Sequence, residues 1–138
     1  MATVHSATYS HARAHLKELL DAAEDGRPAT VSRDLAVTAV VDANRLRHAL
    51  SLLVPSRAEV IKEEGGWSVI LPGLPIAADG NTFDEAMDDM VVALREYAED
   101  WSDHLLHAPN HQNNWGLVQL ITLSNDAQLH SWLHSGAA

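Results

Sequence analysis

The sequence contains no cysteine, and this absence removes several kinds of site at once. A disulfide framework, a thiol nucleophile and a cysteine-based zinc site are all excluded. The chain also lacks an apolar run of about 18 residues and an N-terminal apolar segment of the signal-peptide kind. Both absences argue against export and membrane spanning, so we expect a cytoplasmic protein.

Short catalytic motifs are missing as well. The chain has no G-x-S-x-G, no Walker loop, no G-x-G-x-x-G and no H-E-x-x-H. The acidic pair Asp88 and Asp89 raises the alternative of a two-metal nuclease, but a solvated or partner-facing acidic surface is the simpler interpretation. We therefore expect a protein that is not an enzyme and has no cofactor.

Histidine is common, with nine residues in the chain. The pairs His11/His15 and His130/His134 have helical spacing, as does the series at 104, 107 and 111, and each could place imidazoles on one side of a metal. Pro109 interrupts the last series. Surface or capping histidines are the favoured interpretation, and we predict no metal site.

The charge of the chain is distributed very unevenly. Its 138 residues carry a net charge of −10, which by itself opposes binding to nucleic acid. Residues 1–57 hold seven Lys or Arg against six Asp or Glu, a net charge of +1, whereas residues 58–138 hold two against thirteen, a net charge of −11. This asymmetry suggests that the first part meets phosphate and the second meets a basic protein.

Residues 8–45 have the pattern of a helix, a hairpin and the start of a second helix. Ser10 precedes apolar residues at helical spacing, and Gly26 with Pro28 closes that helix. The segments 29–32 and 36–41 are rich in Val and Thr and flank the charged pair Arg33-Asp34, as in a hairpin. A second helix is predicted over about 42–53. The expected core is small, which makes dimerisation a natural remedy; its members are Leu16, Leu19, Leu20, Val31, Val37, Val40, Leu46 and Leu50.

The order of these residues resembles a known family. Tyr-Ser-His-Ala-Arg-Ala-His-Leu-Lys-Glu-Leu-Leu at 9–20, Asp-Gly-Arg-Pro at 25–28 and Ala-Thr-Val-Ser-Arg at 29–33 are similar to the N-terminal domain of Phd/YefM (prevent-host-death) antitoxins. The resemblance covers roughly residues 3–52 and implies a dimer that binds the operator of its own operon. It departs from the family at 34–36, where a polar or basic residue and a glycine are usual. By the match, the operator contacts are Ser10, Arg13, Lys17 and Arg33.

Residues 58–101 have the pattern of a hairpin followed by a long helix. Val- and Ile-bearing runs at 58–62 and 67–71 flank a glycine turn, and 76–79 is a short candidate strand. Thr82 and Glu85 form a capping box. The apolar stripe of the helix that follows has steps of three and four residues; it consists of Phe83, Met87, Met90, Leu94, Tyr97 and Trp101.

This second pattern resembles the HicB-type antitoxin domain. The similarity rests on Gly-Gly-Trp-Ser-Val-Ile-Leu-Pro-Gly-Leu-Pro at 65–75 and Thr-Phe-Asp-Glu-Ala at 82–86. In that family a small sheet and a helix, in a partial ribonuclease H-like arrangement, hold a toxin. The resemblance therefore implies an interaction module.

Residues 105–138 predict two short helices broken at Ser124-Asn125. Their apolar residues either fold back on the long helix or anchor a partner, and both alternatives stay open. Tryptophans are the residues that most often dominate interface energy. The expected partner anchors are Met90, Leu94, Trp101, Trp115, Leu129 and Trp132.

Together these patterns predict an α+β chain in three parts: a Phd/YefM-like DNA-binding and dimerisation domain over 1–54, a HicB-like toxin-interaction domain over 58–104, and a helical tail over 105–138. The implied function is that of a type II antitoxin, a homodimer or higher homo-oligomer that binds operator DNA and neutralises a basic toxin, a small ribonuclease of the RelE-like or HicA-like kind. The alternative is a dimeric interaction or ligand-binding protein that keeps the fold without binding DNA.

Overall fold

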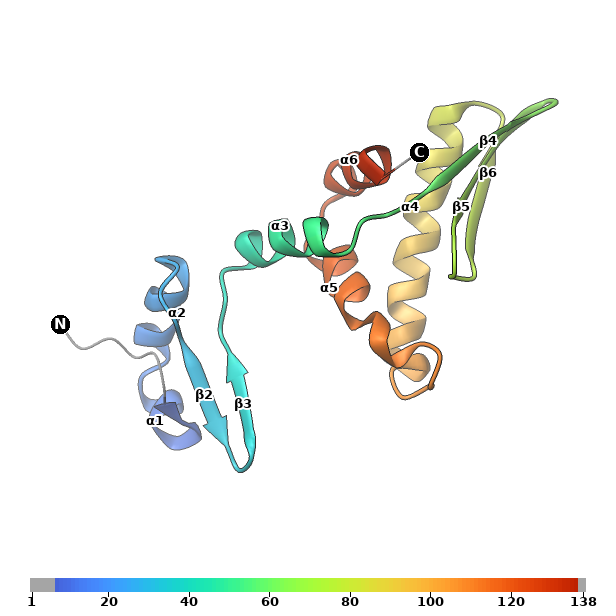
Figure 1. The fold of residues 1–138 in the computed structure, drawn as a ribbon. Helices are drawn as coiled ribbons and strands as arrows, with labels where there is room; N and C mark the ends of the chain where they lie inside the picture. Colours follow the sequence, from blue (N-terminus) through green and yellow to red (C-terminus); the bar gives the residue numbers. More distant parts are fainter. Residues whose placement is uncertain (1–6, 137–138) are drawn as a thin grey trace. The chain divides into compact units, whose positions relative to one another are not determined.

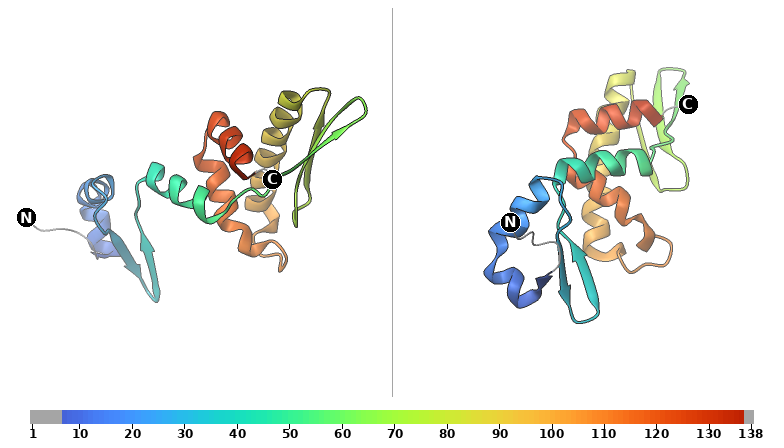
Figure 2. Two further views of the ribbon diagram at one scale, coloured as in Figure 1. Left: turned by 45° about the horizontal axis from the view of Figure 1, so that its top comes forward. Right: turned by 60° about the vertical axis from the view of Figure 1, so that its left-hand side comes forward.

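The computed structural model describes residues 7–136, and the chain divides after Leu46 into two compact units (Figure 1). Each unit has its own three-stranded sheet with its own helices, as the further views also show (Figure 2). The mixed α+β class predicted from the sequence is confirmed.

The sheet of the first unit combines one parallel and one antiparallel pairing. Its strands are β1 (Ala7–Thr8), β2 (Thr30–Arg33) and β3 (Ala36–Ala39), in the order β1-β2-β3. β1 runs parallel to β2, and β2 and β3 form the predicted hairpin, closed by the pair Arg33 and Ala36. Asp34 in the turn has φ 53°, a left-handed conformation that aspartate tolerates better than most residues.

The single helix predicted after Ser10 is in fact two helices. α1 (Tyr9–Ala14) and α2 (Leu16–Glu24) are separated by His15, whose φ of −126° and ψ of 37° are not helical. The expectation that Ser10 caps the helix is wrong, because the Oγ1 of Thr8 accepts from the N–H of His11 at 3.2 Å. Pairing in β1 holds Thr8 extended, so the helix begins one residue before Ser10.

The predicted end of this region at Gly26 is confirmed. Gly26 has φ 79°, and its N–H donates to the carbonyl of Ala23 at 3.0 Å. The N–H of Arg27 donates to the carbonyl of Ala22 at 2.9 Å, which completes a Schellman motif. A left-handed residue is required there, and glycine adopts that conformation without a steric penalty.

The core of the first unit is smaller than the sequence suggested. Three residues of the expected core, Leu16, Leu20 and Val37, are 56%, 46% and 69% exposed. The helical spacing of Leu16 and Leu20 and the strand pattern around Val37 predicted burial, but the sheet and the short helices are too small to cover these side chains. The buried cluster consists of Ala7, Ala12, Leu19, Ala22 and Ala29, with Val31 and Val40 packed against it.

Helix α3 (Ala43–Leu53) is confirmed close to its predicted position, and the division after Leu46 falls within it. The carboxylate of Asp42 accepts from the N–H of Arg45 at 3.1 Å and so caps the first turn. Leu50, expected in the first core, is buried in the second unit, where its side chain lies near Gly116.

The sheet of the second unit is an antiparallel meander of β4 (Glu59–Glu63), β5 (Gly66–Leu71) and β6 (Ile76–Gly80). The predicted glycine turn is confirmed, with Gly65 at φ 87°. The short candidate strand at 76–79 is a full member of the sheet, paired with β5 from Ile76 to Gly80.

Helix α4 (Phe83–Asp100) packs along one face of this sheet (Figure 1). The Oγ1 of Thr82 accepts from the N–H of Glu85 at 3.1 Å, and the Glu85 carboxylate accepts from the N–H of Asn81 at 3.0 Å. The capping box is thereby confirmed, with its return bond one residue earlier than usual. Gly80 seats β6 against this turn, because a Cβ there would lie 2.8 Å from the carbonyl carbon of Glu85.

After α4 the chain forms the π-helical turn η1 (Trp101–Leu105), the 3-10 turn η2 (Gln112–Asn114), and helices α5 (Trp115–Leu123) and α6 (Asp126–Gly136). The predicted break at Ser124-Asn125 is confirmed. Both helices pack against α4, so the segment 105–136 belongs to the second unit rather than forming a separate tail. Its buried side chains include Leu117, Leu120, Ile121, Leu129 and Leu133.

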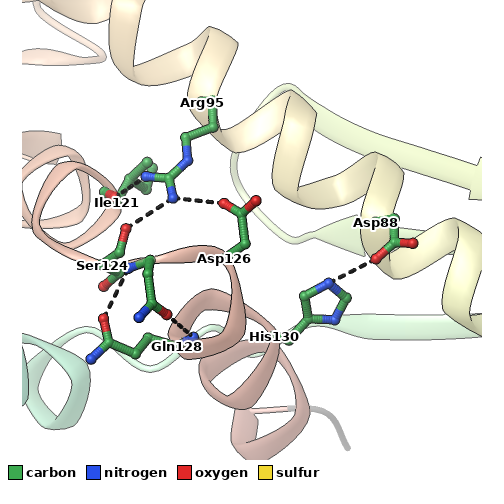
Figure 3. A network of polar contacts seen from close by, with 8 residues as sticks. Asp88, Arg95, Ile121, Ser124, Asp126, Gln128 and His130 are labelled. Carbon is green, nitrogen blue, oxygen red and sulfur yellow. Dashed lines mark hydrogen bonds and ion pairs between the residues drawn. The ribbon is translucent and has the colours of Figure 1, made fainter.

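Arg95 of α4 forms hydrogen bonds and an ion pair with the segment that joins α5 and α6 (Figure 3). Its guanidinium donates to the carbonyls of Ile121 and Ser124, which lie at the end of α5, and pairs with Asp126 at 2.8 Å. The last carbonyls of a helix have no partner within it, so a cation there satisfies them and also opposes their partial charge. The α5–α6 turn is therefore held from outside as well as by its own packing.

No described helix is both long enough and apolar enough to cross a membrane.

Replacing Leu133 by alanine tests whether α6 belongs to the core of the second unit. Leu133 is fully buried, so Leu133→Ala should lower the free energy of unfolding by about 2–5 kcal/mol. The matched change Leu53→Ala removes a side chain that is 77% exposed and should cost less than about 0.5 kcal/mol. All four tryptophans lie after Leu46, so urea unfolding followed by tryptophan fluorescence reports on the second unit alone. Equal costs for the two variants would contradict the packing of α6.

Candidate nucleic-acid interface and partner surfaces

The parallel pairing of β1 with β2 brings the start of α1 beside Arg33. Thr8 is opposite Ser32, so Ser10 and Arg33 follow paired residues at the same end of the sheet. Arg33 also shares a sheet face with Val31, which packs against the helix-bearing core. Arg13 lies on α1, and Ser10, Arg13 and Arg33 are all exposed. The structure therefore gathers three of the four predicted DNA contacts in one region of the first unit.

The other cations of the first unit already have partners. The ammonium of Lys17 pairs with Asp21 at 2.7 Å, and Arg27 pairs with Asp25 at 2.8 Å. Arg45 donates to the carbonyls at the end of α2, including that of Glu24 at 2.7 Å. Within residues 7–136, neither Arg13 nor Arg33 has an ion-pair partner. These two arginines are thus the charges that the unit leaves available to an anionic ligand.

Lys17 differs from the other predicted contacts in its location and in its pairing with a carboxylate. It lies on α2, beyond the break at His15. Its hydrogen bond to Asp21, and then the charge of that carboxylate, raise the pKa of Lys17 above the ordinary value of 10.5. A phosphate would have to share this ammonium with Asp21.

The second face of the first sheet carries exposed apolar side chains beside the polar residues Thr30 and Ser32. Val31 and Thr38 are opposite one another on the face toward the helices, so Val37 and Ala39 lie on the other face. Val37 is 69% exposed, and the nearby Val41 is 50% exposed. β3 is also the outer strand of the sheet as described. An exposed edge strand that carries apolar side chains is a typical site of association between chains.

Most of the predicted partner anchors lie inside the second unit. Met90, Leu94 and Leu129 are fully buried, and Trp132 is 5% exposed, with its indole N–H donating to the carbonyl of Val54 at 2.7 Å. A partner could touch these four side chains only if the core opened. The helical period correctly identified an apolar stripe, but it could not tell packing against the chain's own sheet from packing against another protein.

The two remaining anchors are more accessible. Trp115 is 53% exposed at the start of α5, and Trp101 is half-buried at the end of α4. The indole N–H of Trp101 donates to the carbonyl of His111 at 2.8 Å, so this ring is held by its own unit. Trp115 alone among the six presents a largely open apolar surface.

A different surface, on the open face of the second sheet, was not identified from the sequence. Val69 and Ala78 face α4 and are buried, so Ile70 and Ala77, which are opposite one another, lie on the far face with Ile61. A shallow cavity of about 290 Å³ opens on this face. Exposed acidic residues surround these apolar side chains; they are Glu59, Glu63 and Asp79. We call the six residues on this side of the sheet the acidic sheet face; they are Glu59, Ile61, Glu63, Ile70, Ala77 and Asp79. In the sequence, the signal that could have revealed it is that Glu59, Ile61 and Glu63 stand at every second position and so share one face of a strand.

The acidic residues of α4 do not gather into one site. Asp88 pairs with His130 at 2.9 Å (Figure 3), and the carboxylate of Asp89 accepts from the N–H of Asp79 at 3.4 Å. In the described part of the chain, no group of three metal-ligating residues includes a carboxylate of this helix. The arrangement gives the two-metal nuclease alternative no support.

Comparison with known proteins gives two matches. Residues 1–134 match a family model named PHD-like and described as an antitoxin of toxin–antitoxin systems, RelE/RelB. A crystal structure from Syntrophomonas wolfei subsp. wolfei, of an antitoxin part of a proposed toxin/antitoxin system, is similar in fold with a TM-score of 0.79 at 20% sequence identity. That similarity covers 92% of this chain and 94% of the other. No curated protein matches the chain.

The raised pKa of Lys17 can be tested by removing its partner. In Asp21→Asn the pKa of Lys17 should fall toward its ordinary value, because the hydrogen bond and the charge that raise it are lost. Because the folded-state pKa is raised, the pair stabilises the fold at pH values below 10.5, and this contribution is lost as the pH rises through the raised value. An NMR titration of the lysine side chain measures the change. Asp25→Asn, which removes the partner of Arg27, is the control and should leave Lys17 unaffected.

Proposed function

Since the chain belongs to the PHD-like family of antitoxins from RelE/RelB toxin–antitoxin systems, we propose that it binds and neutralises a cognate toxin and represses its own operon by binding operator DNA. Both activities need only binding, which agrees with a regulatory rather than an enzymatic protein. The cytoplasm, where operator and toxin are both present, is the proposed location. Within this family we assign the first unit to the Phd/YefM type and the second to the HicB-like type.

The observation that carries the DNA-binding proposal is the pair of free arginines in the first unit. Arg13 and Arg33 are exposed, have no ion-pair partner among residues 7–136, and lie on elements that the β1–β2 pairing holds together. A guanidinium can meet a phosphate or a guanine edge through two parallel hydrogen bonds. Ser10 adds a hydroxyl at the same end, and Lys17 contributes less because Asp21 shares its charge.

A homodimer would cover apolar side chains that a single copy exposes. The uncovered face with Val37 and Val41, together with Leu16 and Leu20 on α2, exposes apolar side chains beside a core built largely of alanine. A second copy that covers them would stabilise the unit and place two sets of arginines about a two-fold axis. Two-fold symmetry of the protein in turn matches an operator with two half-sites.

The proposed toxin is basic and of the RelE-like or HicA-like ribonuclease kind. Residues 58–138 carry a net charge of −11, and the acidic sheet face combines that charge with exposed Ile61. Complementary charge steers association, and apolar side chains at the centre of such a surface supply affinity. Trp115 is a second candidate contact. If toxin binding changes the geometry of the dimer, operator affinity and toxin affinity must change together by linkage.

The DNA-binding proposal predicts a specific salt dependence. If Arg13 and Arg33 of each copy meet one phosphate each, the logarithm of the binding constant for DNA from upstream of the gene should fall with the logarithm of salt concentration at a slope of about −3.6. Arg13→Ala or Arg33→Ala removes two contacts per dimer and should reduce the slope to about −1.8. Fluorescence anisotropy at several salt concentrations measures both slopes.

Lys62→Ala is the control, because this cation belongs to the second unit and should leave the slope unchanged. Analytical ultracentrifugation should show that each variant has the same oligomeric state as the original protein. Tight toxin binding with no specific DNA binding would reject autorepression and favour an interaction protein that keeps the fold alone.

The acidic sheet face predicts where a charge reversal disrupts the toxin complex. Ile61 is 40% exposed and lies between Glu59 and Glu63 on this face, so Ile61→Arg should weaken binding of the basic toxin by at least about 100-fold, through lost apolar contact and like-charge repulsion. Val92→Arg is the matched control on α4, where Val92 is 53% exposed. Calorimetry with the protein encoded beside this gene measures both. An unchanged affinity in Ile61→Arg would move the contact to another surface, with Trp115 next to be replaced.

A further inference from the structure

Two histidines and a glutamate meet at the junction of α1 and α2. His11, His15 and Glu18 each offer a ligand atom, and these atoms lie within 4.8 Å of one another. The two imidazole rings are stacked, with centroids 4.2 Å apart, and the Nδ1 of His15 is 3.5 Å from the Glu18 carboxylate. In the described part of the chain, no other three His, Asp or Glu residues bring their ligand atoms within 4.8 Å of one another.

The residue at the N-cap position of α2 is not one that helix capping favours. His15 occupies the N-cap position of α2, yet its side chain accepts no hydrogen bond from that helix. Ser, Thr, Asp and Asn are preferred there because they satisfy a free N–H group. The position therefore gives up a common stabilising contact, while its ring lies between His11 and Glu18. Such departures from local rules concentrate at functional sites.

The geometry points to a binding site for a divalent transition-metal cation of the zinc class, formed by His11, His15 and Glu18. Two imidazole nitrogens and one carboxylate oxygen are a donor set that zinc accepts, with water in the fourth position. Ligand atoms of a zinc ion lie about 2.0–2.2 Å from the metal, so the three groups need to close by about 1 Å or more around it. Their side chains are on the surface and can make this movement by rotation. Glu18 supplies a negative charge that offsets part of the charge of the cation.

Such a site would join the two helices across their break. His11 belongs to α1 and Glu18 to α2, and His15 lies between them. A cation bound to all three would hold the angle between the helices. Ser10 and Arg13 lie on α1, so the metal would also fix the segment proposed to meet DNA. Binding of the metal itself needs neither DNA nor toxin and does not depend on the proposed function.

The test is a titration of the full chain, free of any affinity tag, with Zn²⁺ by calorimetry and with Co²⁺ by visible absorption. One cation per chain is expected at the tight site, with Co²⁺ giving the bands of tetrahedral coordination. His11→Asn, His15→Asn and Glu18→Gln should each weaken binding by at least about tenfold. Amide hydrogen exchange across 9–19 should slow when Zn²⁺ is added to the original protein and should not change in His15→Asn.

The exposed histidines of the second unit provide the control. His104→Asn with His107→Asn removes two imidazoles at helical spacing but leaves the α1–α2 junction intact, so the tight site should persist. Circular dichroism checks that each variant folds. Equal affinity in the original protein and in His11→Asn and His15→Asn, or loss of the tight site in the control, would overturn the proposal.

Discussion

The small core of the first unit is the constraint on which its proposed role depends. Four of the five residues in its buried cluster are alanine, and Leu19 is the one large side chain among them. Burial stabilises in proportion to apolar area, so such a core contributes little by itself. The missing area is present as exposed leucine and valine around the core. Association with a second copy would complete the fold and double the unpaired arginines in one step.

The second unit, in contrast, buries a large apolar core within one chain. Its helices α5 and α6 pack against α4, and the guanidinium of Arg95 donates to the carbonyls of Ile121 and Ser124 at the turn between them. The turn also carries its own capping pair, since Asn125 and Gln128 exchange backbone-to-side-chain hydrogen bonds of 2.9 and 2.8 Å. Because most of the apolar stripe of α4 is buried, the apolar surface that this unit leaves exposed lies mainly on the far side of the sheet and at Trp115.

Local signals in the sequence predicted most of the elements, whereas the assignment of side chains to surfaces needed the structure. The capping box at Thr82, the turns at Gly26 and Gly65 and the two hairpins follow from neighbouring residues, whereas the parallel pairing of β1 with β2 was not predicted. The break at His15 does not, because pairing of β1 shifts the helix start and no nearby glycine or proline marks the break. Likewise, the spacing of Met90 and Leu94 shows that one face is apolar but not what covers it. Arg13 and Arg33 could be proposed as DNA contacts from resemblance, but only the tertiary structure shows that neither has an ion-pair partner among the residues it describes.

The close packing at Gly80 determines which substitutions the protein tolerates at this position. Because the first turn of α4 packs directly against β6, even the single carbon of alanine would meet the backbone of Glu85 and Ala86, and no flexible side chain there could move aside. Position 80 therefore has no conservative replacement. If the protein neutralises a toxin as proposed, a screen for mutants that no longer do so would recover changes at Gly80 together with changes in the binding surface itself. Measuring the amount of folded protein in each mutant would separate the two classes.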